Sequence, residues 1–274
     1  VYGCNMKLRE FMRPLLFHPA IFCLLSSCAS GPPDLPYPAF VNVDELDNVF
    51  IAGLPGARAK QLAGDPRSRR TSNRVRLPED WQFTTGASPS QSVEVFVLSG
   101  EIELGEFTLA SGGYAYLPPG TSGFPMRTVN GARILYFLDE ANERAVIQTP
   151  LIASGPLLEW QKTAPGYSTK ELRSDPGSGA RTWLLKIEPE AMKSWQRSTQ
   201  TLEGYLLSGA MMETECKGEE AVTAEYLPGG YFYRPAGAVS GGPGTATTTG
   251  AVWLLRMRGS GTIEVVSGCM PLQE

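Results

Sequence analysis

The stretches VEVFVLSG at 93–100 and GGYAYLPPG at 112–120 occur a second time in the chain, as LEGYLLSG at 202–209 and GGYFYRPAG at 229–237. Shorter matches precede them in the same order, about 110 residues apart. These matches are Pro55-Gly56 with Pro165-Gly166, Lys60 with Lys170, Leu62 with Leu172, and Asp65-Pro66 with Asp175-Pro176. Because several identities recur in one order, we interpret the chain as an internal duplication.

Each repeat has the pattern of a series of short β-strands. The chain has 30 glycines and 22 prolines, which fall between short apolar runs, as is typical of strands joined by turns. Strand-forming residues dominate 181–187 and 251–255, and Asn130-Gly131 predicts a hairpin turn between the strands on either side. We therefore expect an all-β protein with two units, 41–150 and 151–274.

The amino terminus has the features of an export signal. Basic residues precede an apolar run of about 14 residues, which is too short to span a bilayer comfortably because a spanning helix takes about 20. The run ends in LSSC at 25–28, which resembles a bacterial lipobox and implies lipidation of Cys28. We expect residues 1–28 to be a lipoprotein signal and 29–40 to be a Pro-rich tether. An ordinary secretory peptide is the alternative.

The residue after the cysteine is Ala29. In Gram-negative lipoproteins this is typical of sorting to the outer membrane, so we expect the protein to be anchored in the membrane at its periplasmic face. Removal of the leader would leave 21 basic and 27 acidic residues, and this mildly acidic balance argues against nucleic acid as a partner. Cys216 and Cys269 would remain beside Cys28, and the sequence leaves open whether they pair.

Both repeats carry the pattern G-x5-P-x-G, from Gly112 to Gly120 and from Gly229 to Gly237. With the strand pair that precedes it, this pattern resembles the cupin superfamily, and its double occurrence resembles a bicupin. The opening PGxxxKxLxxDP and the string YFYRPAG further resemble the cupin domain of ChrR-type anti-sigma factors. The resemblance covers nearly all of the mature chain and implies two tandem jelly-roll β-barrels.

The cupin resemblance also implies a metal in each barrel, held by a His-x-His pair, a glutamate and a further histidine. The single histidine of this chain, His18, lies in the leader. The other positions of the motif hold no ligand; they are Val93 and Leu202 for the glutamate, Gly123 and Ser240 for the last histidine, and Ala87, Pro89, Gln196 and Ser198 near the His-x-His pair. We therefore expect neither a metal nor another cofactor.

Two glutamates, Glu94 and Glu203, stand one residue past the expected ligand position. Successive side chains of a strand point to opposite faces, so we expect both to face outward and to be solvated. A local bulge, which could turn either inward, is the alternative. On the other face, Val93, Val95 and Val97 are expected to fill the first barrel as core.

The second barrel is the better candidate for a small-ligand pocket, because several of its polar and aromatic residues map to the strands and the turn at its mouth. These residues are Trp195, Gln196, Ser198, Tyr231, Tyr233 and Ser240. Packing of the tyrosines as ordinary core is the alternative. Arg197 and Arg234 could meet an anionic ligand, although we interpret them as solvated surface residues.

Other chemistry finds little support in the sequence. The chain has no G-x-S-x-G elbow, no P-loop and no C-x-x-C. Asp44-Glu45 and the carboxylates of Glu213, Glu215 and Glu219-Glu220 are interpreted as solvated charge runs.

The leading hypothesis is a lipid-anchored, metal-free bicupin that binds a small apolar or weakly anionic ligand or a partner protein without catalysis. A cupin-fold enzyme working through Glu, Tyr or Lys is one alternative, and a purely structural lipoprotein is another. The sequence leaves a homodimer open.

Overall fold

Strands make up most of the described chain, which in this computed structural model comprises residues 40–65 and 68–269. The predicted lipoprotein signal, Cys28 and all of the tether except Phe40 lie outside the described residues. The described residues form one compact unit. Within them, no helix has the length and hydropathy needed to cross a membrane.

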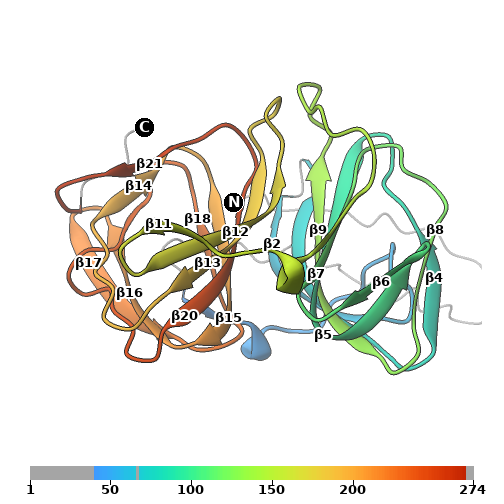
Figure 1. Ribbon diagram of the computed structural model, residues 1–274, viewed down its shortest axis with the longest axis horizontal. Helices are drawn as coiled ribbons and strands as arrows, with labels where there is room; N and C mark the ends of the chain where they lie inside the picture. Colours follow the sequence, from blue (N-terminus) through green and yellow to red (C-terminus); the bar gives the residue numbers. More distant parts are fainter. Residues whose placement is uncertain (1–39, 66–67, 270–274) are drawn as a thin grey trace, which may run out of the picture. The chain divides into compact units, whose positions relative to one another are not determined.

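Eight strands of the first repeat and β10 of the second form a nine-stranded sheet that curls into a barrel, drawn mostly in blue to green in Figure 1. Its main path runs β10-β7-β5-β9-β3-β2, and β4, β6 and β8 branch from it. The strands are β2 (Arg58–Asp65), β3 (Arg70–Leu77), β4 (Trp81–Thr85), β5 (Gln91–Leu104), β6 (Phe107–Ala110), β7 (Gly113–Leu117), β8 (Phe124–Thr128), β9 (Ala132–Glu140) and β10 (Leu151–Ser154).

The second repeat, together with β1 of the first, builds two sheets, one of seven strands in the order β1-β18-β15-β20-β13-β12-β11 and one of five in the order β17-β16-β19-β14-β21. The strands of the seven-stranded sheet are β1 (Val41–Asn42), β11 (Gln161–Ala164), β12 (Tyr167–Ser174), β13 (Arg181–Ile187), β15 (Leu202–Gly209), β18 (Gly230–Arg234) and β20 (Ala251–Met257). The strands of the five-stranded sheet are β14 (Gln196–Ser198), β16 (Met211–Lys217), β17 (Glu220–Tyr226), β19 (Val239–Ser240) and β21 (Ile263–Val265).

The strands predicted at 181–187 and 251–255 are confirmed as β13 and the first part of β20. The repeated Ser-Gly that ends each matching motif also has a structural reason. Gly100 and Gly209 adopt φ of 78° and 82°, and a Cβ atom at either would lie within 2.4 Å of a backbone carbonyl oxygen. Only glycine satisfies both conditions without strain.

The hairpin predicted at Asn130-Gly131 is wrong in its pairing. The turn is present, and Gly131 has φ of 78°. However, β8 before it pairs with β4 and β5, whereas β9 after it pairs with β3 and β5. The turn is therefore a corner between two parts of the barrel, a connection that local turn chemistry does not distinguish from a hairpin.

The opening strand of each repeat pairs with the barrel of the other repeat. β1 lies antiparallel to β18 of the second repeat, and β10 lies antiparallel to β7 of the first. A 3-10 turn follows each exchanged strand, η1 (Val43–Glu45) and η2 (Gly155–Leu157). The matched lysines of the two repeats hold these turns, because the Lys60 ammonium donates to backbone carbonyls of Asp44 and Leu46 and Lys170 donates to that of Gly155.

Three apolar clusters form the core. One fills the first barrel and includes Val93, Val95 and Val97, which confirms their prediction as core. A second fills the second barrel around Trp253 and Phe232. The third lies between the barrels and combines residues from both repeats. Its largest members are Phe96, Tyr114, Tyr116, Phe137, Tyr205 and Tyr231.

Cys216 and Cys269 form a disulfide. Cys216 lies on β16 and is buried. Residue 269 follows β21, the edge strand of the same five-stranded sheet. The disulfide thus ties the carboxyl-terminal segment to the second barrel.

Candidate functional site

The interior of the first barrel has no metal-binding character. At the predicted glutamate position, Val93 is buried within the apolar cluster, and Ala87 is buried in the same cluster. The remaining members of that cluster are apolar side chains. The positions of the cupin ligands that fall in this cluster therefore hold apolar side chains.

The interior of the second barrel contains a compact ionic cluster. Glu213 and Glu215 lie on the same face of β16 as the core residue Met211. Arg234 binds Glu215 through two nitrogen atoms, at 2.6 and 2.8 Å, and lies 3.3 Å from Glu213. Lys193 donates to Glu213 at 2.6 Å. The two carboxylates are balanced by two cations.

This cluster corrects two of the predictions. Glu213 and Glu215 are 2% and 1% exposed, and Arg234 is 4% exposed, so none of the three is a solvated surface residue. The charge run reads as a loop in the sequence, yet two of its members alternate inward along a regular strand. Arg197 lies at intermediate burial and pairs with Glu264 on β21.

The ligand set for a cupin metal does not fit this chain. Among residues 40–65 and 68–269, no three His, Cys, Asp or Glu side chains lie close enough to hold a metal ion together. Where Glu213 and Glu215 do come close to each other, Arg234 and Lys193 already occupy their oxygens.

The six predicted pocket residues separate into two groups. Gln196 pairs in register with Ser240, and Trp195 and Ser198 lie beside them on the same part of the second barrel. The structure brings these four together. The other two, Tyr231 and Tyr233, belong to the cluster between the barrels. The Tyr231 hydroxyl donates to Glu203 at 2.8 Å.

Glu94 and Glu203 lie between the barrels. As predicted, they point away from their own barrel interiors. The expectation that they are solvated is wrong, because they are 1% and 2% exposed. The outer face of each barrel at this point is covered by the other barrel, and period-two alternation cannot show what covers an outward face.

The two glutamates are bound in a crossed arrangement. Glu94 accepts from Tyr114 of its own barrel and from Thr182 of the other, both at 2.6 Å. Glu203 accepts from Tyr231 of its own barrel and from Ser72 of the other. The strand registers make these sets equivalent, because Glu94 lies opposite Tyr116 in the first repeat and Glu203 lies opposite the matching Tyr233 in the second. The interface is therefore a pseudo-two-fold contact of the kind found in symmetric dimers.

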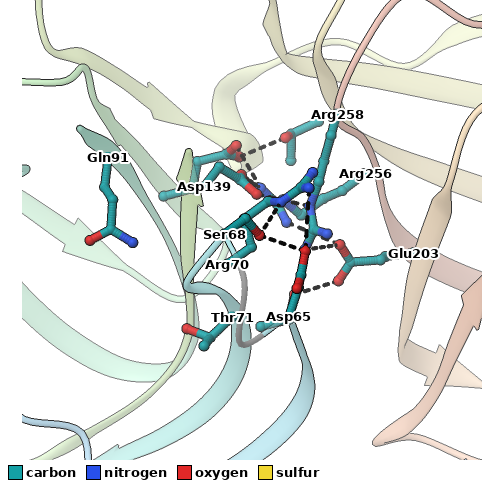
Figure 2. Close-up of polar contacts among 12 residues, drawn as sticks. Asp65, Ser68, Arg70, Thr71, Gln91, Asp139, Glu203, Arg256 and Arg258 are labelled. Carbon is teal, nitrogen blue, oxygen red and sulfur yellow. Dashed lines mark hydrogen bonds and ion pairs between the residues drawn. The ribbon is translucent and has the colours of Figure 1, made fainter. Parts of the chain in front are cut away.

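Three arginines of the second repeat complete the network, and Figure 2 shows two of them, Arg256 and Arg258, beside Asp139 and Glu203. Arg256 bridges Glu94, Asp139 and Glu203. Arg258 lies 2.6 Å from Glu203 and 2.8 Å from Asp139.

The third arginine, Arg173, donates to Glu94 at 2.8 Å. The three cations thus face three carboxylates, those of Glu94, Asp139 and Glu203.

The charges and the burial shift several pKa values. Burial alone would raise the pKa of Glu94, but the positive charges of Arg256 and Arg173 outweigh it and hold this pKa well below its ordinary value. Burial and the neighbouring Glu94 carboxylate raise the pKa of Tyr114. Burial and the neighbouring Glu203 carboxylate raise the pKa of Tyr231 in the same way. Glu94 is therefore ionised, and Tyr114 and Tyr231 are protonated, at neutral pH.

A hollow of about 360 Å³ opens beside this network, which we call the interbarrel hollow. Both repeats line it, and its wall contains Arg173, Arg256 and Arg258 together with Glu94 and Asp139. Arg70 and Arg144 also belong to the lining, and both are less buried. Tyr116 lies under the guanidinium of Arg173, whose central carbon is 3.8 Å from the ring centroid.

The interbarrel hollow was not predicted from the sequence, because the residues that line it come from segments of both repeats that are far apart in the chain. One indication was present. A glutamate interrupts the apolar run at the same position in both repeats, in VEVFV and LEGYL. A charge kept at equivalent positions of two buried strands indicates a shared buried partner.

Comparison with solved structures identifies the fold. A candidate dioxygenase from Nostoc punctiforme is 21% identical with a TM-score of 0.65, covering 83% of this chain and 86% of that one. Protein YlbA from E. coli is 18% identical, also with a TM-score of 0.65, over 83% and 93%. Oxalate decarboxylase OxdC from Bacillus subtilis, compared as a point mutant, is 13% identical with a TM-score of 0.60, over 86% and 82%.

These structural neighbours have the cupin fold, and the chain shares it. The prediction of an all-β protein with two tandem jelly-roll barrels is confirmed. At these identities the likeness establishes the fold and no activity. No protein-family model matches the sequence, and no curated protein matches it.

Proposed function

We propose that this bicupin binds a small molecule in the interbarrel hollow, without a catalytic metal inside either barrel. The observation that carries the proposal is the contrast between the barrel interiors and the space between them. The first interior is packed with apolar side chains, and the second contains a balanced ionic cluster. The interbarrel hollow, in contrast, combines open volume with convergent polar groups, which is the usual character of a small-ligand site.

The proposal extends to the place of the protein in the cell. The lipobox-like LSSC at 25–28 and Ala29 support a lipid anchor on Cys28 at the periplasmic face of the outer membrane. The resemblance to the cupin domain of ChrR-type anti-sigma factors belongs to the same proposal. Cys28→Ser should move the protein from the membrane fraction to the soluble fraction. Continued sedimentation of this variant with membranes would contradict the anchor.

Ligand binding is tested by hydrogen exchange on the detergent-solubilised full chain. The panel contains small organic acids, the amides of the same acids and neutral sugars. At least one class should slow amide exchange in 139–145, the end of β9 and the loop after it, which border the hollow. Ala141→Trp, which fills the hollow from this loop, should abolish the protection. A panel that leaves exchange unchanged throughout would refute the proposal.

Two further measurements separate this site from other locations. Trp195 lies at the second barrel, so Trp195→Ala should leave protection of 139–145 unchanged. Its loss in that variant would instead favour the pocket predicted from the sequence. Metal analysis of the purified full chain tests the proposal that neither barrel holds a catalytic metal. A stoichiometric, tightly bound transition metal would overturn it.

A further inference from the structure

We infer that the interbarrel hollow recognises a carboxylate group, and that the Nε–Nη2 edge of Arg173 is the recognising element. The inference rests on the proposed function and names the ligand class for that same site. It starts from the hydrogen bonds of Arg173, a residue 7% exposed at the end of β12.

Arg173 uses little of its hydrogen-bonding capacity. A guanidinium carries five N–H donors. Within the described residues, Arg173 donates a single hydrogen bond, from Nη1 to Glu94. Its Nε is buried and has no hydrogen-bond partner there. An unsatisfied buried donor is destabilising, so a ligand that satisfies this edge of the guanidinium gains affinity from the new hydrogen bonds.

The position of the arginine is fixed before a ligand arrives. The Tyr116 ring supports the guanidinium at 3.8 Å, and Glu94 holds Nη1 on one side. The Nε and Nη2 donors that remain lie on one edge of the planar group and point in parallel. This spacing matches the two oxygens of a carboxylate in a bidentate contact.

The charge around the hollow favours a small anion over a polyanion. The buried network balances three arginines with three carboxylates. The other charged residues of the lining include Glu140 and Glu143 as well as Arg70 and Arg144. Because the lining has no large positive excess, directional hydrogen bonds to Arg173 carry recognition more than the overall field does.

The experiment uses succinate and acetate as probes, with succinamide and acetamide as matched neutral controls and inorganic phosphate as a second oxyanion. Titration is followed through the side-chain Nε–Hε NMR signal of Arg173 in the full chain. Succinate should shift this signal, and succinamide should not. Arg173→Lys keeps the positive charge and removes the two parallel N–H donors. It should weaken succinate binding by roughly tenfold.

Arg181→Lys is the control, because Arg181 is half exposed and pairs with Glu171 outside the hollow. It should change the Kd for succinate by less than about twofold. If Arg173→Lys fails to fold, the wild-type Nε–Hε titration against the amides still decides the question. Binding of amides but not acids in the hollow would overturn the inference and leave the proposed function intact. Protection by none of the acids, amides and neutral sugars would overturn both.

Phosphate tests whether recognition depends on the two parallel N–H donors of Arg173 or on positive charge alone. Phosphate binding as tight as succinate binding that also survives Arg173→Lys would overturn the inference, because the site would then recognise a point charge.

Discussion

Glu94 and Glu203 occupy equivalent positions in the two repeats, and each accepts one hydrogen bond from a tyrosine of its own barrel and one from a hydroxyl of the other. Because of this crossed contact, the interface between the barrels combines specific hydrogen bonds and ion pairs with apolar packing. It also places the arginines that border the interbarrel hollow, since Arg173, Arg256 and Arg258 are held by the same carboxylates.

Neutralising either glutamate should destabilise the protein strongly. Glu94→Gln leaves the buried Arg173 without its charge partner and removes one of the three carboxylates around Arg256, and breaking a buried pair from one side costs about 3–5 kcal/mol. Glu203→Gln should have a similar effect through Arg256 and Arg258. Urea denaturation measures both. Glu101→Gln, on an exposed part of the same strand β5, is the control and should change stability by less than about 0.5 kcal/mol.

The effect of Glu94 should depend on pH in a defined direction. Because the folded protein holds the pKa of Glu94 below the ordinary value of 4.5, its ionisation stabilises the fold fully above pH 4.5. That contribution is lost as the pH falls further toward the folded-state pKa. The difference in unfolding free energy between wild type and Glu94→Gln should therefore be constant from pH 7 to 5 and shrink below 4.5. A difference that grows on acidification would contradict the assignment.

The ionic cluster inside the second barrel predicts a non-additive pair of substitutions. Arg234→Met leaves Glu215 buried without its bidentate partner and should cost about 3 kcal/mol or more. Adding Glu215→Leu removes the orphaned charge and should restore most of the loss. The double-mutant cycle is measured by thermal and urea unfolding. Additive losses in the double variant would show that the two residues do not form the pair described here.

The disulfide between Cys216 and Cys269 should contribute measurable stability. It closes a loop with a sequence separation of 53, for which the chain-entropy model gives about 4 kcal/mol. Cys216→Ser with Cys269→Ser should lower the urea midpoint, and a reducing agent should lower it in wild type but not in the double variant. Equal sensitivity of the two proteins to the reducing agent would contradict this pairing.

The fold was predictable from the sequence because the repeat preserves the residues that fix barrel geometry. Gly100 and Gly209 are required by backbone conformation and close approach, and Lys60 and Lys170 hold the turns after the exchanged strands. Such local requirements leave identities in both repeats, and these identities revealed the duplication.

The candidate site was not predictable in the same way. The alternation of β5 and β15 correctly placed Glu94 and Glu203 on the outer face, but solvent exposure depends on what packs against that face. The partners Arg256 and Asp139 come from the far ends of β20 and β9, and no short-range pattern links them to the glutamates. The charges inside the second barrel escaped prediction for the related reason that Glu213 and Glu215 are separated from Arg234 by a whole hairpin.

The exchange of β1 and β10 has a consequence for how the gene can be divided. A fragment cut after residue 150 would keep β1, whose pairing partner lies on the other fragment, and would lack the strand that borders β7. Each half would then expose an unpaired strand edge, which is a template for aggregation. The two halves should accumulate in soluble form when produced together and precipitate when produced apart, so the duplication behaves as one indivisible folding unit.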